Sequence, residues 1–516
     1  MSESTQTQQI TWPDPADRVQ PGRTEPLARG WVEFLGGPMG RFAQIGRARF
    51  WTPLRSIIAV AYVFLSFGLL QKAHCAGGKA DDNGIIQLNW DGNRQYTAAC
   101  YNDIIPLYGA RGLDKGGFVY DYSWVEEGLT RYMEYPVLAG LFQQLSAWLS
   151  RSTYFLVDNF VPDSGWYFYV TALLMSIIWV ITIRMVAELA GNRIWDTLLV
   201  AGSPLLIVHA FTNWDIPSIF FAVAAMLAAR NRKFWLAGVL IGLGTAFKLW
   251  PIFLLGAYLT VALRKRDLAP FGKMLAAMVV SWLVVNVPVY LRNPDAWGEF
   301  NRLNTDRGWE WTTIYAVISR MTGWTGFDSG EGAPVILNAV TLILFLLGCL
   351  GVLILGLKAP QTPRIAELVC LIVGLFLIFN KVWSPQYSLW FVIPAVLALP
   401  HWRLLLSWMV VDMAVWPVLM WHMMGADNMG VPGWFLNVVI ISRDAFIIAI
   451  MVLVVQQILG RRRDKVRDAH NGHDPLMSLP QQWKEPLPID APPAPTEQPE
   501  PGELASSSAG GSTAVK

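Results

Sequence analysis

Apolar stretches recur along most of the chain and are separated by short polar turns. The first covers residues 56–70, and others fall near residues 166–188, 195–211, 215–229, 234–247, 250–263, 272–291, 334–357, 365–380, 385–400, 403–421 and 434–459. A helix that crosses a bilayer at right angles needs roughly 20 apolar residues, so several of these runs are short for a span. Together they predict an all-α polytopic membrane protein, a bundle of about 12 transmembrane helices.

The composition supports this class. The chain has 516 residues, of which 53% are hydrophobic and only 15% are charged, and 25 of them are tryptophans. These values lie outside the range of soluble globular proteins. The net charge of +2 is close to neutral, so no strong basic field indicates a nucleic-acid partner. No short apolar segment with a small-residue cleavage site comes first, so we expect residues 56–70 to be retained as a span.

The positions of the basic residues predict an orientation, because turns rich in Lys and Arg face the cytoplasm. If the N-terminus is cytoplasmic, every basic turn falls on that side. These turns contain Arg193; Arg230, Arg232 and Lys233; Arg264, Lys265 and Arg266; Lys358 and Arg364; Arg403; and Arg461, Arg462 and Arg463. The outer side then receives the long polar segments 71–165 and 292–333, and both termini are expected in the cytoplasm of a cell whose plasma membrane holds the protein.

One weaker apolar segment, residues 135–155, is predicted to lie in the outer interface rather than to span. Val137, Leu138, Leu141, Phe142, Leu145, Trp148 and Leu149 recur there at helical spacing, and Gln143, Gln144, Ser146 and Ser150 take the other side. A spanning helix is the alternative. It would place residues 151–165 inside and would disrupt the positive-inside pattern downstream.

The chain therefore divides into three regions. Residues 1–55 form a cytoplasmic segment that ends in Arg41, Arg47, Arg49 and Arg55 with no acid between them, residues 56–460 form the transmembrane domain, and residues 461–516 form a tail. The tail is charged and then rich in Pro, Ser, Ala and Gly, so we expect it to be disordered. No fixed-period repeat or matching halves, such as many transporters have, is visible.

The stretch CYNDIIPLYGAR, residues 100–111, lies in the first outer segment and carries the leading candidate for chemistry. Asp103 precedes Ile104-Ile105-Pro106, so it can cap a helix N-terminus, present a carboxylate to a substrate, or do both. Cys75 and Cys100 flank this stretch and can form a disulfide or remain free thiols. We predict that they pair, since closing such a loop contributes roughly 3–4 kcal/mol.

Other polar residues gather at the same predicted outer boundary, where ionised side chains are costly and therefore informative. Glu134 and Tyr135 are either a solvated acid with an interfacial aromatic or substrate contacts. Lys248 and Lys381 both lie against the positive-inside tendency. Each can reach back to the interface with its long side chain, but two lysines on the uncommon side favour one shared anionic ligand, a phosphate.

Three further candidates are weaker. Gln386 and Tyr387 follow Pro385 at the start of a span, and Asp215 follows Asn213-Trp214 in what can be a simple tight turn. Arg307 lies in a tryptophan-rich loop that suits sugar stacking, although an aromatic belt explains the tryptophans equally well. Nucleotide-binding, dinucleotide and nucleophile-elbow motifs and paired metal ligands are absent from the sequence, so an enzyme here needs an activated substrate delivered by the membrane. We expect no cofactor, and a bound divalent metal is compatible with this view.

The motifs DIIPLYGARGL (103–113), EYPVLAGLF (134–142), KLWP (248–251) and SPQY (384–387), in this order, resemble glycosyltransferase family 87. This family comprises polyprenyl-phosphate-sugar-dependent membrane enzymes of the GT-C fold, including actinobacterial mannosyltransferases. The resemblance implies that Asp103 in an outward first loop is the catalytic base. Tyr108, Arg111, Glu134, Tyr135, Asp215, Lys248, Arg307, Lys381, Gln386 and Tyr387 are then expected to bind substrate.

The resemblance also implies the reaction. The expected enzyme is an inverting glycosyltransferase that moves a sugar, expected to be mannose, from a polyprenyl-phosphate donor to an envelope glycolipid or glycan. A flippase or exporter of polyprenyl-linked glycan is the alternative function. A scaffold role in envelope assembly is a third and weaker one. The predicted partners are therefore the lipid-linked donor, the envelope acceptor and membrane lipids.

Overall fold

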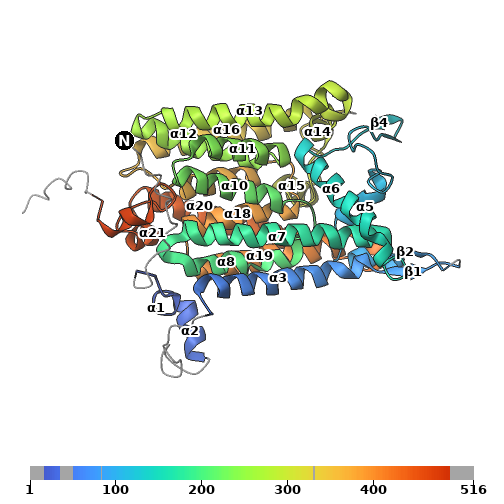
Figure 1. Ribbon diagram of the computed structural model, residues 1–516, viewed down its shortest axis with the longest axis horizontal. Helices are drawn as coiled ribbons and strands as arrows, with labels where there is room; N and C mark the ends of the chain where they lie inside the picture. The colour runs from blue at the N-terminus through green and yellow to red at the C-terminus, as the bar shows by residue number, and fades with distance from the viewer. Residues whose placement is uncertain (1–16, 35–49, 83, 329–331, 488–516) are drawn as a thin grey trace, which may run out of the picture.

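The computed structural model describes residues 17–34, 50–82, 84–328 and 332–487, and nearly all of its regular structure is helical. The helices of the main bundle lie side by side along its long axis (Figure 1). They are α3 (Pro53–Ala76), α7 (Asp163–Ala190), α8 (Leu198–Ala201), α9 (Pro204–His209), α10 (Ile216–Arg230), α11 (Phe234–Phe247), α12 (Phe253–Lys265), α13 (Ala269–Arg292), α16 (Val335–Lys358), α17 (Ile365–Phe379), α18 (Ser388–Ala398), α19 (Trp402–Met423) and α20 (Gly433–Ile458).

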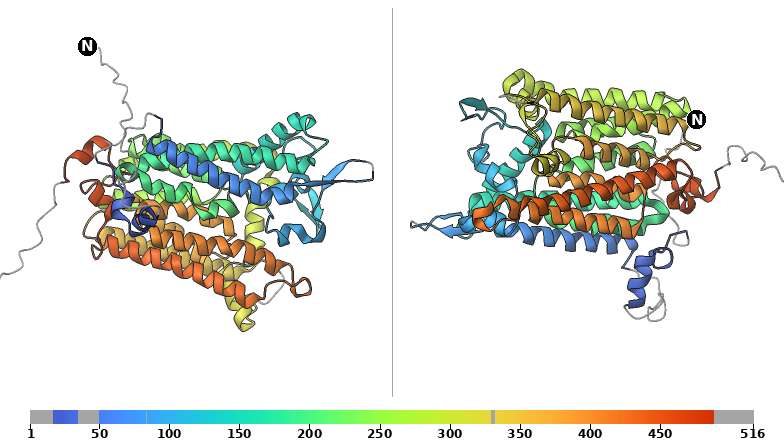
Figure 2. Two further views of the ribbon diagram at one scale, coloured as in Figure 1. Left: turned by 90° about the horizontal axis from the view of Figure 1, so that it is seen from below. Right: turned by 180° about the vertical axis from the view of Figure 1, so that it is seen from behind.

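Short elements cover the two ends of this bundle (Figures 1 and 2). One end carries α1 (Pro21–Thr24), α2 (Pro26–Phe34), α21 (Lys465–Ala469) and the 3₁₀ helix η7 (Pro480–Lys484). The other, which we call the loop end, carries β1 (Gly78–Ala80), β2 (Ile86–Leu88), η1 (Asp91–Asn93), α4 (Arg94–Thr97), α5 (Ile104–Ala110), β3 (Trp124–Glu126), β4 (Leu129–Arg131), α6 (Val137–Thr153), η2 (Tyr154–Leu156), α14 (Pro294–Asp306), α15 (Ile314–Thr322) and η6 (Ala426–Asn428). The strands form two antiparallel hairpins, β1–β2 and β3–β4. Three further 3₁₀ turns, η3 (Gly191–Thr197), η4 (Trp250–Ile252) and η5 (Pro385–Tyr387), lead into bundle helices.

Each apolar run of the sequence falls on helix, which confirms the polytopic helical class. Within the described residues, six helices are long and apolar enough to cross a membrane: Pro53–Ala76, Asp163–Ala201, Ala269–Arg292, Val335–Lys358, Trp402–Met423 and Gly433–Ile458. The other runs form shorter apolar helices, so the number of crossings stays a prediction. The two long polar segments lie together at the loop end (Figure 2).

Helix α6, at the loop end, is amphipathic. Its polar face is turned toward the protein and its apolar face is exposed, the reverse of a surface helix in a soluble protein. Its small and polar side, including Gln143, Ser146 and Ser150, is buried against the protein, while Leu145 and Trp148 are 49% and 58% exposed. This orientation is expected next to lipid, because apolar side chains there gain nothing by leaving the surface. On this face Ser146 donates to the Phe142 carbonyl one turn earlier in the same helix.

The glycine-rich stretch of α11 permits close packing against α13. A Cβ atom added to Gly238 would overlap the Met274 carbonyl oxygen, and one added to Gly242 would overlap the Ser281 side chain. Small residues four apart therefore bring two backbones together, as they commonly do in membrane bundles. This contact fixes the end of α11, from which Lys248 projects.

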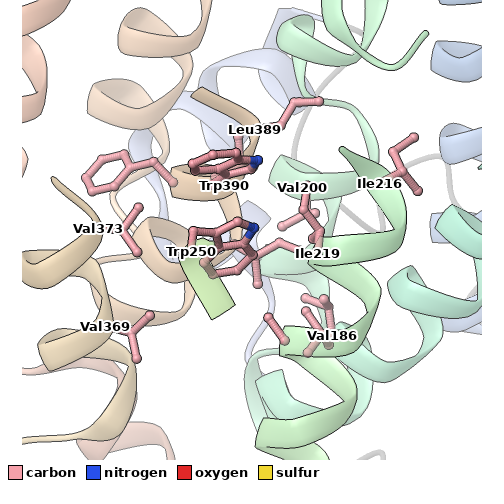
Figure 3. Close-up of a cluster of buried hydrophobic side chains, with 14 of the residues drawn as sticks. Val186, Val200, Ile216, Ile219, Trp250, Val369, Val373, Leu389 and Trp390 are labelled. Atoms are coloured by element: carbon pink, nitrogen blue, oxygen red, sulfur yellow. The ribbon is translucent and has the colours of Figure 1, made fainter. Parts of the chain in front are cut away.

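Below the loop end, a layer of buried aromatic and aliphatic side chains fills the bundle centre (Figure 3). The rings of Trp250 and Trp390 stack with centroids 6.0 Å apart. Their indole nitrogens donate to the Ser218 hydroxyl and to the Asp215 carboxylate, each at 2.9 Å. The two tryptophans thus form an apolar layer beneath the loop end, and Trp390 holds the Asp215 carboxylate in place by its hydrogen bond.

Part of the tail is folded, contrary to the disorder predicted for residues 461–516. Asp464 pairs with the fully buried Arg364 at 2.7 Å, and His470 accepts the Asn192 backbone N–H at 3.0 Å. Lys465 pairs with the buried Glu25 of the N-terminal segment at 2.8 Å. Buried charges need such partners, and composition does not reveal them. Arg41, Arg47, Arg49 and residues 488–516 lie outside the described residues.

Candidate active site

A cavity of about 640 Å³ opens at the loop end, between α5, the β3–β4 hairpin, α14 and the ends of α11 and α17. Acidic, basic, amide and aromatic side chains line it together with apolar ones such as Leu107, Leu249 and Leu303. Nine residues that the sequence proposed line it: Asp103, Arg111, Glu134, Tyr135, Lys248, Arg307, Lys381, Gln386 and Tyr387. The structure therefore brings together residues from five separate parts of the chain.

Asp103 stands at the N-terminus of α5 but does not cap it. The side chain of the preceding residue, Asn102, accepts the Ile105 backbone N–H at 3.0 Å and takes that role. The Asp103 backbone N–H donates to the Thr212 carbonyl at 2.8 Å, which joins this turn to the turn before α10. Because capping does not use it, the Asp103 carboxylate is free to face the cavity.

Asn213 links the charged groups of the cavity. Its Nδ2 donates to Asp103 Oδ2 at 2.7 Å and to the Tyr135 hydroxyl at 2.8 Å. Its Oδ1 accepts from Lys248 Nζ at 3.0 Å and from the Trp214 backbone N–H at 2.6 Å. The Asn213 amide therefore connects Asp103, Tyr135 and Lys248, the first two through its nitrogen and the third through its oxygen.

The surroundings of Asp103 act on its pKa in opposite directions. Burial raises the pKa of Asp103, while hydrogen bonds from Asn213 and Tyr101 and the positive charges of Lys248 and Lys72 lower it. The net effect is a pKa above the ordinary value for aspartate. A carboxylate tuned in this direction is a stronger base once it is ionised.

Lys248 follows the last residue of α11 and is supported from behind by Asp215. The Lys248 Nζ lies 3.8 Å from Asp215 Oδ1, and the same oxygen accepts the Trp390 indole N–H at 2.9 Å. Asp215 is fully buried and does not line the cavity, so it supports Lys248 rather than contacting a ligand there. Lys248 in turn lies 5.0 Å from the ring centroid of Tyr135.

Arg111 and Glu134 form an ion pair of 2.7 Å in the cavity wall. The Arg111 guanidinium also lies 4.1 Å from the ring centroid of Trp124, on the β3–β4 hairpin. Such a planar group, held by a carboxylate and an indole, is fixed in orientation.

Lys381 and Arg307 form a second basic group at the C-terminal end of α14. Lys381 Nζ donates to the carbonyls of Thr305 and Arg307, and no carboxylate lies within ion-pair distance of it among residues 17–34, 50–82, 84–328 and 332–487. Arg307 pairs with Glu310 at 3.2 Å. Burial and then the charge of Arg307 lower the pKa of Lys381 to about 8. An added anion would raise that pKa again, so this pair is suited to bind one.

The turn η5 supplies the remaining predicted residues. Gln386 and Tyr387 line the cavity, and the Tyr387 ring stacks on Trp390 at 4.0 Å between centroids. This stack connects the cavity wall to the tryptophan layer beneath it. Tyr108 does not line the cavity. It is buried, and its ring stacks on that of Tyr167 with the two centroids 4.6 Å apart.

Sequence reasoning missed one whole wall of the cavity. The β3–β4 hairpin contributes Trp124, Glu126, Glu127 and Arg131, and α14 contributes Glu299, Asn301 and Asn304. Glu299 is buried and pairs with Arg302 at 2.5 Å. The only signal was local: two acids before a glycine in WVEEGLTR predict a tight hairpin turn. Among the described residues, no group of three or more His, Cys, Asp or Glu side chains is arranged to hold a metal ion.

Cys75 and Cys100 form a disulfide that ties the end of α3 to the segment before Asp103. The Trp90 indole N–H donates to the Cys75 carbonyl at 2.9 Å, which adds a second link in the same place. The backbone that leads into the catalytic candidate is therefore held on both sides, by the disulfide before Asp103 and by the Thr212 carbonyl at Asp103 itself.

The model of glycosyltransferase family 87 matches residues 132–380. This range contains Glu134, Tyr135, Asn213 and Lys248, while Asp103 lies before it and Lys381 directly after it. No curated protein matches the chain.

Proposed function

Because the chain belongs, through residues 132–380, to glycosyltransferase family 87, we propose that it is a GT-C-type, inverting glycosyltransferase. It transfers a sugar, mannose in the first instance, from a polyprenyl-phosphate donor to an envelope glycolipid or glycan. The observation that carries this proposal is the position of the Asp103 carboxylate. It does not cap α5, and Asn213 connects it to Lys248 at the cavity.

In the proposed arrangement, about 12 transmembrane helices cross the plasma membrane and the loop end faces outward. Two features support it. The basic turns of the sequence then all face the cytoplasm. The described segments before α3 and after α20 are also joined at one end by the Lys465–Glu25 ion pair, as an even number of passes requires.

Asp103 acts as the general base in the proposed reaction. Its ionised carboxylate takes the proton of an acceptor hydroxyl while that oxygen attacks the anomeric carbon of the donor sugar. The new bond joins the acceptor oxygen to this carbon, and the bond from the carbon to the donor phosphate oxygen breaks. Attack opposite the leaving group inverts the configuration. Asn213 and Tyr101 orient the carboxylate and leave it with unused lone pairs.

Departing polyprenyl phosphate gains negative charge, so fixed cations stabilise the transition state more than the donor. Lys381 is the strongest candidate for this role because it has no carboxylate partner in the part of the chain that the structure describes. Lys248 shares its charge with Asp215 and hydrogen-bonds to Asn213, so it contributes both to phosphate binding and to holding the base. The reaction needs no organic cofactor because the donor is already activated.

The hairpin and α14 side chains suit the hydroxyl-rich acceptor. Acids and amides such as Glu126, Glu127, Asn301 and Asn304 accept and donate hydrogen bonds, and Trp124 offers an aromatic face for a sugar ring. The end of α14 also contacts Lys381 through the Thr305 and Arg307 carbonyls, so the acceptor wall borders the basic pair that holds the donor phosphate.

The test is sugar transfer from radiolabelled polyprenyl-phosphate donors in membranes that contain matched amounts of each variant. Asp103→Asn keeps the side-chain shape and leaves the α5 cap intact, so the protein should accumulate normally while the rate falls by a factor of roughly 10²–10⁴. Asp121→Asn is the matched control, since Asp121 belongs to the same segment but pairs with Arg292 outside the cavity.

Two results would contradict the proposal in different ways. Transfer at the parental rate by Asp103→Asn would show that Asp103 is not the base. If the parent transfers no sugar from any such donor while lipid-linked glycan still crosses the membrane in its presence, the protein is a flippase.

A further inference from the structure

Arg443 lies within α20, one of the helices long and apolar enough to cross a membrane, and its side chain is fully buried. An ionised side chain in such a helix is costly, so its contacts are informative. Asp444 offsets part of this cost, because its Oδ1 accepts from Arg443 Nε at 3.0 Å. The guanidinium also makes contacts outside α20.

Those contacts reach two segments of the loop end that are far apart in the sequence, residues 310–312 and 381–383. Arg443 Nη2 donates to the Thr312 carbonyl at 2.6 Å, and the guanidinium carbon lies 3.4 Å from the ring centroid of Trp383. The Thr312 hydroxyl donates to the Trp383 carbonyl, so the two segments are also bonded to each other. A planar guanidinium donates to a carbonyl and lies on an indole face at the same time, which suits arginine to this place better than lysine.

The same two segments contain the groups that hold the basic pair of the cavity. Lys381 stands two residues before Trp383, and Glu310, the ion-pair partner of Arg307, stands two residues before Thr312. The Glu310 backbone N–H donates to the Lys381 carbonyl at 2.8 Å, which is a second bond between the segments. The position of the basic pair therefore depends on how these segments are held.

Arg320 of α15 adds another link between the first of these segments and α20. Its Nε donates to Asn437 Oδ1 on α20 at 2.7 Å, and its Nη1 donates to the Trp311 carbonyl at 2.9 Å. Asn437 is buried, as Arg443 is. Helix α20 thus uses two buried polar side chains to support this part of the loop end.

We propose that Arg443 is a positioning residue of the transfer reaction, which holds the two segments together so that the basic pair faces the donor phosphate. The inference rests on the proposed function, because it concerns the phosphate site of that reaction. Arg443 does not line the cavity itself, so it acts on a ligand there only through the segments that it contacts.

A purely structural role, in which the buried pair only stabilises α20, is the competing explanation. Removing Arg443 alone would leave Asp444 buried and unpaired, so the test variant replaces both residues, Arg443→Gln with Asp444→Asn. The matched control is Arg230→Gln with Glu188→Gln. It removes a pair that is buried to nearly the same degree, at the last residue of α10 and away from the loop end.

The test variant should raise the donor KM by about tenfold, as expected when one charge-assisted hydrogen bond to phosphate is weakened. The acceptor KM and the acid limb of the pH profile should stay in place, and the control pair should leave the donor KM unchanged. A test variant that lowers kcat without raising the donor KM would overturn the inference.

Thr312→Val is a second variant that leaves every charge in place. It removes the hydrogen bond from the Thr312 hydroxyl to the Trp383 carbonyl, so the donor KM should rise in the same direction. The test therefore does not depend on how well the double variant folds. An unchanged donor KM in Thr312→Val would show that the bond between the two segments does not position the phosphate site.

A further measurement needs no activity and separates failure of this inference from failure of the proposed function. Purified protein is methylated with formaldehyde and a borohydride reductant, and the rates at Lys381 and Lys248 are followed by mass spectrometry. Lys381 Nζ is held by the Thr305 and Arg307 carbonyls, so loosening the segments should raise its rate in the test variant and leave that of Lys248 unchanged.

Equal rises at both lysines, or no rise at Lys381, would overturn the inference whether or not the parent transfers sugar. A raised rate at Lys381 alone, in a protein whose parent transfers no sugar, would contradict the proposed function and not the positioning of Lys381 by Arg443.

Discussion

Replacing Asn213 by alanine tests whether the amide bridge sets the state of the proposed base. The change removes the 2.7 Å hydrogen bond to Asp103 and the 3.0 Å bond from Lys248 in one step. A hydrogen bond to a charged group contributes about 1.5–3 kcal/mol. Since one pKa unit corresponds to about 1.4 kcal/mol, the pKa of Asp103 should rise by one to two units.

The sign of the effect follows from the role of Asp103. Burial already raises the pKa of Asp103, and loss of the Asn213 bond raises it further. Only the ionised form accepts a proton, so activity is present above this pKa and falls as the pH drops through it. The acid limb of kcat/KM for Asn213→Ala should therefore move to higher pH by one to two units, and each unit costs about tenfold in rate at a fixed pH below the new pKa.

The assay is donor-dependent sugar transfer across a pH series at saturating acceptor. Asn304→Ala is the control, because Asn304 also lines the cavity but donates to the Phe300 carbonyl and not to Asp103. It should change the KM for acceptor and leave the limb in place. If kcat/KM of Asn213→Ala falls equally at every pH, Asn213 does not set the pKa of Asp103 and acts only through the positions of its neighbours.

Two other predictions concern the arrangement around the site. Single cysteines introduced near residues 232, 265, 360 and 465 should be shielded from an impermeant thiol reagent in intact cells, while those near residues 120 and 310 should react with it. Labelling at residue 232 or 265 would contradict the proposed orientation. Cys75 and Cys100, 25 residues apart, are joined in the structure; the double serine variant should lose roughly 3–4 kcal/mol of stability, and free thiols at both positions in non-reducing peptide maps would contradict the pairing.

The sequence was most informative where structure depends on local pattern. An apolar run without polar interruption has few options other than a buried or lipid-facing helix, so the runs located α7, α13, α16 and α20 within a few residues. Helix α3 continues past its apolar run into a polar last turn and a half, up to Ala76. The glycine spacing of α11 is a local pattern of the same kind, because residues four apart share one face of a helix and close contact there requires a small side chain. Shorter helices such as α18 were found too, although their length cannot show whether they cross a membrane.

Prediction failed where a choice depends on contacts between distant segments. Asn102 and Asp103 are both good caps, and only the bond from the Asp103 backbone to the Thr212 carbonyl favours Asn102 for that role. The folded part of the tail depends on Arg364, which lies about a hundred residues earlier in the chain. The face of α6 that packs inward could not be told from periodicity, because the same pattern serves a helix beside water or beside lipid.

Four polar residues in or directly behind the cavity share a local arrangement, which explains why short motifs far apart in the sequence meet there. Asp103, Asp215, Lys248 and Ser384 each stand where one helix has ended and the next begins, and each is followed within three residues by a proline in the first turn. Proline fits that turn because its missing N–H has no partner to lose there. The end of a helix also leaves backbone groups that need polar surroundings, so a charged side chain placed there is better tolerated than one in mid-helix. Junctions far apart in the sequence, at Asp103, Lys248 and Ser384, meet at the loop end of the bundle. The polar residues before Pro106, Pro251 and Pro385 thus line one cavity, and Asp215, before Pro217, lies buried behind Lys248 and supports it. The chemistry of the site follows from that placement.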